Sequence, residues 1–384
     1  MTKILLSANT DWFLYNFRSS FAAYLRERGF EVVLVSPPGT YAPKFEEKGF
    51  RWIPWNLGRQ TLQPWRELPS FRQLADIYRR EAAELLHHHT IKPVLYGSLM
   101  ARLMGIDNVV NSITGRGYVY LSKEPRARFL KQITSILYRL ALNNNNFASI
   151  FENDTDRRYF IDHKFTPEQR TWLISGIGVD PDHFKPEPEP AGIPTILFSG
   201  RMLWDKGVGV LVDATRILHK QVQVRVVLTG EPDPGNPASI SKEQLLEWQE
   251  QGIIEWWGWQ PEMNRIYIKS HIVTLPTMYG EGVPTVLLEA ASCGRATVAT
   301  DMPGCSDITI HGKTGLIVPV NDPLALAEAL HTLIRDENQR GRMGLAARQL
   351  VLDKFTSERV NEATLNVYNK VLQHSLSQQG EPNP

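Results

Sequence analysis

The sequence has few cysteines, almost no net charge and no long apolar run. Only two of its 384 residues are cysteines, too few for a disulfide framework and typical of a reducing compartment. The formal net charge of +1 gives no overall attraction to nucleic acid, so a charged ligand must be bound by a local cluster. No apolar run reaches the roughly 18 to 20 residues of a membrane span, and the N-terminus turns polar too early for a signal peptide. We expect a cytoplasmic protein without a nucleic-acid partner.

Two common nucleotide-binding signatures are also absent. No GxGxxG follows the first apolar run, which argues against a dinucleotide-dependent oxidoreductase. The sequence HGKT at 311–314 is similar to the end of a phosphate-binding loop, but Asp307 occupies the position where that motif requires glycine. The sequence therefore does not indicate an ATPase.

Short apolar runs alternate with amphipathic stretches in both halves of the chain. Residues 3–8 predict a strand, residues 17–30 a helix and residues 31–36 a second strand, and the alternation restarts at TILFSG, residues 195–200. This pattern predicts parallel sheets that are covered by helices on both faces. Because the chain is longer than one hydrophobic core usually serves, we expect an α/β protein with two Rossmann-like domains facing each other across a cleft.

Shifts in composition predict the domain boundaries. Residues 176–190 are rich in proline, glycine and acidic residues, as in a linker with a stiff end. We expect an N-terminal acceptor-binding domain at 1–175 and a C-terminal nucleotide-sugar-binding domain at 191–355. A helix at 356–375 should return to the N-terminal domain, followed by a disordered tail at 376–384. Ligands of such sheets bind beyond the carboxyl ends of the strands, so the loops there are the candidate site.

Four charged residues stand out in the second half. Arg201 and Lys206 follow a predicted strand, where two cations can flank a diphosphate, although they could also be solvated surface residues. Glu281 precedes a helix that should begin near Pro284 and stop at Gly294. The N-terminus of that helix, approached through Gly282, is a potential anion site. Glu289 lies inside the helix between apolar residues, where a buried carboxylate needs donors such as two ribose hydroxyls; a solvated acid is the alternative.

These motifs together resemble the retaining glycosyltransferases of the GT-B fold, specifically glycosyltransferase family four. The resemblance rests on FSGRMLWDKG, LTGEPD, the EGVP and LLEA stretches and MPGCSDITIHGKTGLIVPVND, and it covers residues 173–335. It implies a hexosyltransferase that needs neither metal nor cofactor. The implied donor is a nucleotide-diphosphate sugar, which we expect to be a UDP-sugar carrying a hexose or an N-acetylhexosamine.

The resemblance also implies roles for individual residues. Glu281 would contact the transferred sugar, Glu289 would bind the ribose, and Arg201 and Lys206 would neutralise the leaving diphosphate. The catalytic residues would thus be Glu281, Arg201 and Lys206. The donor-binding residues would be Gly200, Glu231, Trp259, Gly282, Val283, Pro284, Thr285 and Glu289, with Trp259 near the base.

Candidate metal ligands are few, and each has a simpler explanation. The sequences Asp154-Thr155-Asp156 and Asp180-Pro181-Asp182 match the Asp-x-Asp of metal-dependent glycosyltransferases, but both lie in turn-rich sequence where aspartate caps helices and turns. His87 and His89 point the same way on a predicted strand, but no third ligand is evident. We expect no metal site.

The first half carries the expected acceptor side. NSITGRGYVY and HTIKP resemble the subgroup that extends lipid-linked oligosaccharides in bacterial polysaccharide synthesis, which implies a saccharide acceptor on undecaprenyl diphosphate. The chain departs from the family at residues 9–12, where relatives often have a glycine pair, and at Thr114, where many have histidine. The candidate acceptor-side residues are Asn16, Arg18, His89, Lys92 and Thr114.

An amphipathic helix within residues 123–142 has two readings. Its apolar face (Phe129, Ile133, Ile136, Leu137 and Leu140) is flanked by Arg126, Arg128, Lys131 and Arg139. Such a helix can dock on the inner, anionic face of a membrane, or it can pack on its own sheet with a solvated basic side.

Two other functions are consistent with the fold: a nucleotide-sugar epimerase or hydrolase, and a non-catalytic nucleotide-sugar-binding protein.

Overall fold

A computed structural model describes residues 1–58, 64–115 and 125–379, and the chain forms two compact units. The N-terminal domain contains residues 1–177 together with the chain from Val360, and the C-terminal domain contains Gly178–Arg359. Each domain is built around one parallel sheet. The predicted α/β class and the two Rossmann-like sheets are confirmed.

The sheet of the N-terminal domain has seven parallel strands in the order β3-β2-β1-β4-β5-β6-β7. Its central strands are buried because helices cover both faces, and they include polar residues such as His88 and Asn111. The strands are β1 Lys3–Ser7, β2 Glu31–Ser36, β3 Arg51–Pro54, β4 Leu85–His89, β5 Val109–Ile113, β6 Phe147–Phe151 and β7 Thr171–Leu173.

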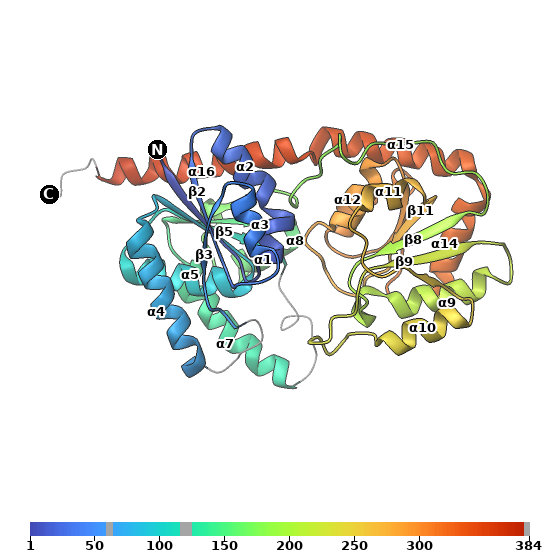
Figure 1. Ribbon diagram of the computed structural model, residues 1–384, viewed down its shortest axis with the longest axis horizontal. Coiled ribbons are helices and arrows are strands. Elements are labelled where there is room, and N and C mark those ends of the chain that lie inside the picture. The colour runs from blue at the N-terminus through green and yellow to red at the C-terminus, as the bar shows by residue number, and fades with distance from the viewer. Residues whose placement is uncertain (59–63, 116–124, 380–384) are drawn as a thin grey trace. The chain divides into compact units, whose positions relative to one another are not determined.

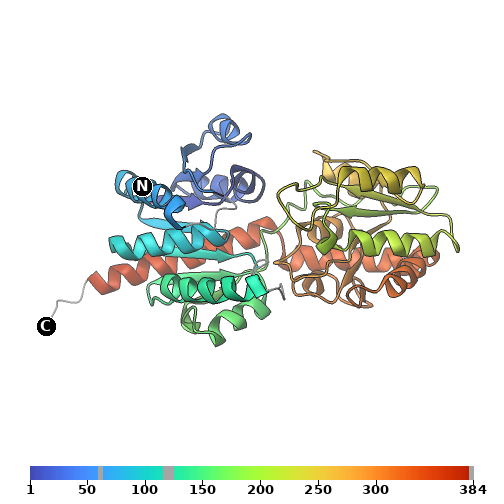
Figure 2. The ribbon, with the colours of Figure 1, turned by 90° about the horizontal axis from the view of Figure 1, so that it is seen from below.

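Two groups of helices cover this sheet (Figure 1). Helices α2 (Ser19–Glu27) and α16 (Ser357–Gln379) pack on one face, and α4 (Pro64–Glu81) and α5 (Ile91–Met104) on the other. Helix α7 (Pro125–Leu142) lies beside α5 (Figure 2). The shorter helices are α1 Asp11–Phe17, α3 Ala42–Glu47, α8 Asp154–Asp162 and η1 Glu168–Arg170.

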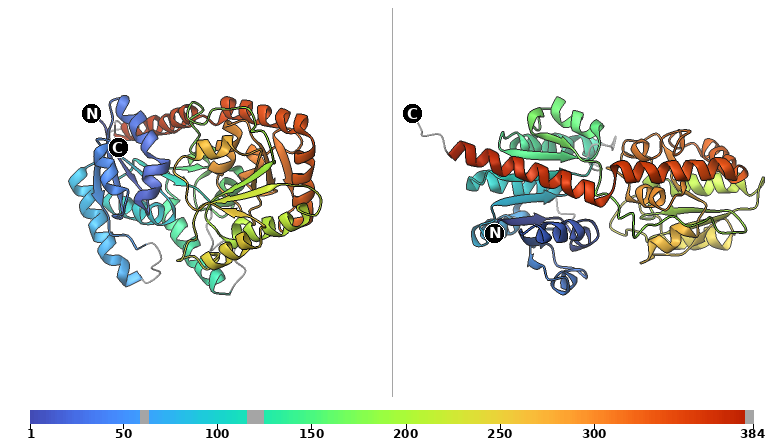
Figure 3. Two further views of the ribbon diagram at one scale, coloured as in Figure 1. Left: turned by 45° about the vertical axis from the view of Figure 1, so that its right-hand side comes forward. Right: turned by 90° about the horizontal axis from the view of Figure 1, so that it is seen from above.

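Helix α16, near the C-terminus, belongs to the N-terminal domain from Val360 onward. Its residues Val360, Val367, Tyr368 and Val371 are buried in the same core as β1 and β2, and the right-hand view of Figure 3 shows the helix lying along that domain. The helix continues to Gln379, beyond the predicted end at 375, because no helix-breaking residue occurs before Gly380. The rest of the predicted tail, residues 380–384, lies outside the described residues.

The sheet of the C-terminal domain has six parallel strands in the order β10-β9-β8-β11-β12-β13. Helices α9 and α14 pack together on one face, and α11 and α12 cover the other (Figure 1). The strands are β8 Thr195–Ser199, β9 Arg225–Thr229, β10 Glu255–Trp256, β11 Ile272–Leu275, β12 Ala296–Thr300 and β13 Gly315–Val318. The helices are η2 Trp204–Lys206, α9 Val208–Leu218, α10 Lys242–Glu250, α11 Met263–Ile268, α12 Thr285–Ser292, α13 Cys305–Ile308, α14 Pro323–Arg335 and α15 Glu337–Lys354.

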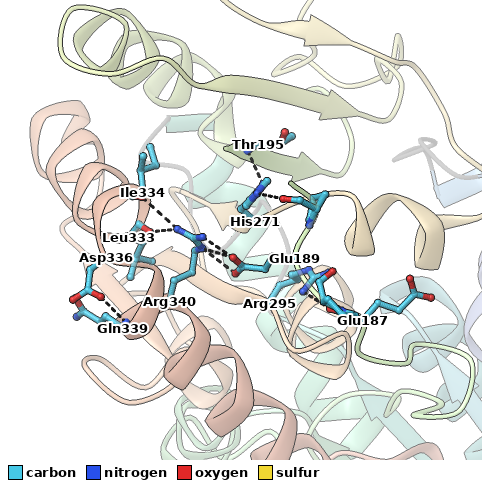
Figure 4. A network of polar contacts seen from close by, with 12 residues as sticks. Glu187, Glu189, Thr195, His271, Arg295, Leu333, Ile334, Asp336, Gln339 and Arg340 are labelled. Atoms are coloured by element: carbon cyan, nitrogen blue, oxygen red, sulfur yellow. Dashed lines mark hydrogen bonds and ion pairs between the residues drawn. The ribbon is translucent and has the colours of Figure 1, made fainter. Parts of the chain in front are cut away.

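Residues 181–190, here called the strap, are fixed to the C-terminal domain. Arg348 donates hydrogen bonds to the carbonyl oxygens of Pro181 and Phe184, at 3.1 and 3.0 Å. Arg295 donates to the carbonyl of Glu187 at 2.9 Å, and the buried Arg340 forms an ion pair with Glu189 (Figure 4). The composition of this segment suggested a linker. It did not reveal the arginines, distant in sequence, that hold the segment in place.

Candidate functional site

Two glycines bring the loops after β8 and β9 into backbone contact. Gly200 follows β8, and Gly230 follows β9 with a φ of +126°. A Cβ on Gly230 would lie 1.9 Å from the carbonyl oxygen of Gly200, so only glycine fits there. The amide of Met202 donates to the carbonyl of Glu231 at 3.0 Å, which ties the loop carrying Arg201 to the next loop.

A third glycine positions Lys206. Gly207 has a φ of +77°, and a Cβ on it would lie 1.9 Å from the carbonyl oxygen of Pro276, just after β11. The close approach places Lys206 against the loop that carries Glu281, and the two side chains form an ion pair. Burial alone would lower the pKa of Lys206, but Glu281 and Tyr279 outweigh it and the pKa is raised. Lys206 is therefore a charged, mostly buried ammonium group.

The loop of Glu281 rests on the segment after β12. The amide of Glu281 donates to the carbonyl of Pro303 at 3.2 Å. A Cβ on Gly304, whose φ is +84°, would lie 1.6 Å from the carbonyl oxygen of Gly282, so this position also requires glycine. Gly304 lies in the MPGCSD motif, but nothing in the sequence indicated that it supports Gly282.

Helix α12 begins and ends as predicted. Pro284 is its N-cap residue and Gly294 follows its C-terminus with a φ of +69°. Because proline has no side-chain acceptor, no side chain of the N-cap satisfies the first amides of this helix. An anion at this end of the helix can therefore accept hydrogen bonds from the first backbone amides, which start at Thr285.

Glu289 is held by a tyrosine that sequence reasoning missed. The hydroxyl of Tyr267 on α11 donates to Oε2 of Glu289 at 2.8 Å. Burial raises the pKa of Glu289 to about 7, and the hydrogen bond from Tyr267 opposes that rise only in part. The sequence suggested a buried carboxylate from the apolar neighbours of Glu289. It gave no signal for Tyr267, which comes from another helix.

Two further acidic groups complete this surface. Arg201, about half exposed, forms a 2.8 Å ion pair with Asp233, a second residue that sequence reasoning missed. The carboxylate of Glu231 accepts a hydrogen bond from the amide of Trp259 at 3.0 Å. The indole of Trp259 is 58% exposed, as a base-stacking surface would be. The candidate donor-side residues therefore lie in loops that follow the strands of this sheet, except Thr285 and Glu289, which lie in α12.

Comparison with known proteins identifies the family. Residues 3–151 match the family described as "Glycosyl transferase 4-like", and residues 193–336 match "Glycosyl transferases group 1". The chain belongs to these glycosyltransferases. Both halves of the protein are thus covered, and the family uses nucleotide-sugar donors.

Among curated proteins, the glycosyltransferase is similar to N,N'-diacetylbacillosaminyl-diphospho-undecaprenol alpha-1,3-N-acetylgalactosaminyltransferase of Campylobacter jejuni. The two are 25% identical over 376 residues, which cover 94% of this chain and 96% of that enzyme. Among solved structures it is similar to sucrose-phosphate synthase of Thermosynechococcus elongatus, with a TM-score of 0.80, 19% identity and coverage of 97% and 100%. It is also similar to Anabaena HepE in complex with UDP and glucose, with a TM-score of 0.78, 17% identity and coverage of 96% and 100%.

The three histidines of β4 differ in their surroundings. His87 contacts the Tyr368 hydroxyl at 2.5 Å and the Ser112 hydroxyl at 2.8 Å, and His88 contacts Tyr78 at 2.9 Å and Asn111 at 3.0 Å. His89 is fully buried, and neither of its ring nitrogens has a partner. His87 and His89 lie on the same side of the strand, as predicted, with ring centroids 3.9 Å apart.

The other candidate acceptor-side residues of the glycosyltransferase are spread over the N-terminal domain. Arg18 is buried between α1 and α2, whereas Asn16 is exposed and donates to the carbonyl of Trp12 at 2.9 Å. Lys92 forms a 2.8 Å ion pair with Glu67. Thr114 lines a small pocket at the carboxyl end of β5.

Of the two Asp-x-Asp sequences, the second has the capping role that was expected, whereas the N-cap residue of α8 is Asn153 and not an aspartate of the first. Asp180 accepts from the amides of Asp182 and His183, at 2.9 and 3.2 Å. Asp154 forms an ion pair with Arg158 at 2.6 Å in the first turn of α8. Within residues 1–58, 64–115 and 125–379, no group of three His, Cys, Asp or Glu side chains is arranged to hold a metal ion.

Helix α7 presents apolar side chains to solvent. Ile133, Ile136 and Leu140 are 41%, 56% and 53% exposed, whereas Tyr138 on the other side of the helix is buried. The side chains of Arg126, Arg128 and Phe129 lie outside the described residues. In the part of the chain that the structure describes, no helix has the length and apolarity that a bilayer span requires.

Proposed function

We propose that the C-terminal domain binds a UDP-sugar as its donor. The single observation that carries the proposal is the ion pair between Lys206 and Glu281 in front of the α12 N-terminus. A diphosphate can accept hydrogen bonds from Lys206 and from the amides of the helix, while a sugar hydroxyl donates a hydrogen bond to Glu281. HepE, a structural neighbour, has been solved with UDP and glucose, which supports uracil as the base.

Glu289 is assigned to the ribose. Its carboxylate already accepts one hydrogen bond from Tyr267, and a carboxylate has acceptor positions for more donors. Glu231 follows β9 and Trp259 follows β10, and the two, joined by a hydrogen bond, are assigned to the base and its ribose. Gly200, Gly282, Val283, Pro284 and Thr285 contribute backbone surface that lets the phosphates and the sugar approach closely.

The proposed reaction is sugar transfer with retention of configuration. As the bond between the sugar and the diphosphate breaks, negative charge grows on the leaving oxygen. Lys206 and Arg201 stabilise that charge without a metal, and their benefit is greatest in the transition state. For the donor to bind, the ion pairs of Lys206 with Glu281 and of Arg201 with Asp233 must break. Both cations can then pair with the phosphates.

The proposed acceptor is a saccharide on undecaprenyl diphosphate, in the assembly of a cell-surface polysaccharide. The Campylobacter enzyme, similar over 94% of this chain, is named for a diphospho-undecaprenol-linked substrate. The exposed Ile133, Ile136 and Leu140 of α7 fit peripheral contact with the inner face of a membrane, where such an acceptor would be presented. N-acetylhexosamine is the proposed transferred sugar.

The test is product analysis with a polyprenyl-diphosphate-linked N-acetylglucosamine. The protein is incubated with this acceptor and with UDP-N-acetylglucosamine, UDP-N-acetylgalactosamine or UDP-glucose, in buffer containing EDTA. We expect a disaccharide product by mass spectrometry, and none with Glu281→Gln. Formation of an epimerised or hydrolysed UDP-sugar without acceptor would replace the proposal by the epimerase or hydrolase alternative.

A further inference from the structure

Arg18 is a buried cation without an ion pair. It lies between the end of α1 and the start of α2, and the residue is 7% exposed. Its Nε is buried and has no hydrogen-bond partner, and no described residue forms an ion pair with it. Burial lowers the pKa of Arg18, and Glu152 and Tyr368 oppose that change only in part. A folded protein that leaves a guanidinium in this state loses stability.

His89 is the second unsatisfied group, and its two neighbours show that this is unusual. His87 and His88 each use both ring nitrogens within the domain. His89 uses neither, although it is fully buried. Burial, together with the nearby His87 and Arg18, lowers the pKa of His89, so the ring is neutral and offers one donor and one acceptor.

Both groups lie next to one aromatic ring, that of Phe13. Cζ of Arg18 is 5.8 Å from the centroid of Phe13, and the His89 ring centroid is 6.0 Å from the same ring. His89 ends β4 and Phe13 belongs to the helix that follows β1. They therefore lie at the carboxyl ends of adjacent strands, the edge at which parallel sheets bind ligands.

The chemistry of this pair suits a phosphate. A guanidinium presents a planar set of donors that matches two phosphate oxygens, and a neutral imidazole adds one N–H. Lys92, the other cation nearby in sequence, is already paired with Glu67. Two buried polar groups without hydrogen-bond partners in the protein do not stabilise the fold. Binding of a ligand to them explains their presence better.

We propose that Arg18 and His89 form an anion subsite that binds the diphosphate of the lipid-linked acceptor. The identity of the acceptor rests on the proposed function. The anion subsite itself rests on the two unpartnered side chains.

The test is calorimetric titration of the full-length protein with farnesyl diphosphate, farnesol and inorganic pyrophosphate, each with and without saturating UDP. We expect wild-type protein to bind farnesyl diphosphate and not farnesol, because the diphosphate carries the recognition. Arg18→Met should weaken that binding by about tenfold or more, since charge-assisted hydrogen bonds are lost. Arg18→Lys should weaken it less. The affinity for UDP should be unchanged in both variants. Arg28→Met is the matched control, because Arg28 lies on the same helical segment but covers the Tyr24 ring at the surface.

Two further readouts separate binding from folding. The melting temperature of Arg18→Met should equal or exceed that of the wild type, because a desolvated charge is removed. One imidazole NMR signal, absent in His89→Phe, should shift on addition of farnesyl diphosphate. Equal binding by Arg18→Met and wild type, or a lower melting temperature with unchanged binding, would overturn the proposal. Failure of UDP to bind, with farnesyl diphosphate still bound, would instead refute the proposed donor.

Discussion

The two domains differ in whether the polar side chains at their strand ends have hydrogen-bond or ion-pair partners. In the C-terminal domain each candidate group has a partner: Lys206 with Glu281, Arg201 with Asp233, and Glu289 with Tyr267. In the N-terminal domain Arg18 and His89 are buried at the corresponding edge without partners. Groups that are paired within the protein cost little, whereas buried groups without a hydrogen-bond or ion-pair partner reduce stability.

The difference has a consequence for affinity. A donor that enters the C-terminal domain must replace existing ion pairs, so part of its binding energy is offset by the pairs that it breaks. An anion that reaches Arg18 replaces no ion pair. Substitutions should therefore separate the two sites by the sign of their effect on stability.

The largest expected effect comes from a buried arginine that is paired. Arg340→Met should lower the free energy of unfolding by about 3 to 5 kcal/mol, because it leaves Glu189 without its cation and frees the strap. Urea titration measures this change, and Arg342→Met, at another position of α15, is the control. If Arg340→Met and Arg18→Met change stability in the same direction by the same amount, the contrast between paired and unpaired arginines is wrong.

The next effect concerns catalysis. Lys206→Ala should lower kcat by about 10² to 10³ and change the dissociation constant for the UDP-sugar much less, because charge develops as the diphosphate leaves. Steady-state kinetics and calorimetry together measure the two quantities. Lys220→Ala, exposed at the end of α9, should leave both unchanged. Equal losses in kcat and affinity would reduce Lys206 to a ground-state binding residue.

A smaller effect depends on pH through Glu289. With a pKa of about 7, its carboxyl group is largely protonated below that pH and accepts fewer hydrogen bonds from ribose. The affinity for UDP-glucose, whose diphosphate does not titrate in this range, should therefore rise about tenfold between about pH 6 and pH 8. Glu289→Gln should lose this dependence. A flat profile in the wild type would contradict the ribose assignment.

The same group should affect stability with a defined sign. The folded-state pKa of Glu289 is raised from 4.5 to about 7, so between these values the folded protein holds a proton that the unfolded chain has released. Stability from this group is therefore present at low pH and is lost as the pH rises toward and through 7. Relative to Glu289→Gln, the unliganded wild type should lose up to about 3 kcal/mol over this window.

The smallest effect concerns the exposed ion pair. Asp233→Asn should raise the affinity for UDP by only about twofold to threefold, because an exposed pair between Arg201 and Asp233 is weak and partly screened by solvent. The gain should shrink at high salt. A loss of affinity in this variant would show that Asp233 orients Arg201 for the ligand and does not compete with it.

The candidate site of the C-terminal domain could be proposed from the sequence because its residues lie in short motifs. Spacing and helix geometry indicated an anion site at the start of α12, between Glu281 and Glu289, and the resemblance to glycosyltransferase family four supplied the roles of the individual residues. The partners Tyr267 and Asp233 come from other elements and have no local signal. The unsatisfied state of His89 also required the fold, because His87, His88 and His89 look equivalent in the sequence.

The strap shows the same limit in the fold. Proline and acidic residues predicted a linker, but three arginines from α15 and the α12–β12 connection hold the segment on the C-terminal domain. The alternation of apolar strands with amphipathic helices was enough for both sheets, because periodicity is a local property. Contacts between distant segments are not a local property, so the sequence pattern does not predict them.

We propose that Lys206, Glu281 and Glu289 form a site for a uridine diphosphate sugar. Calorimetric titration of the purified glycosyltransferase with UDP, GDP and ADP tests this site. We expect UDP to bind more tightly than GDP or ADP, and Glu289→Ala to weaken UDP binding. Preference for another nucleotide would contradict the assigned base, and no binding of any of the three would contradict the donor site itself.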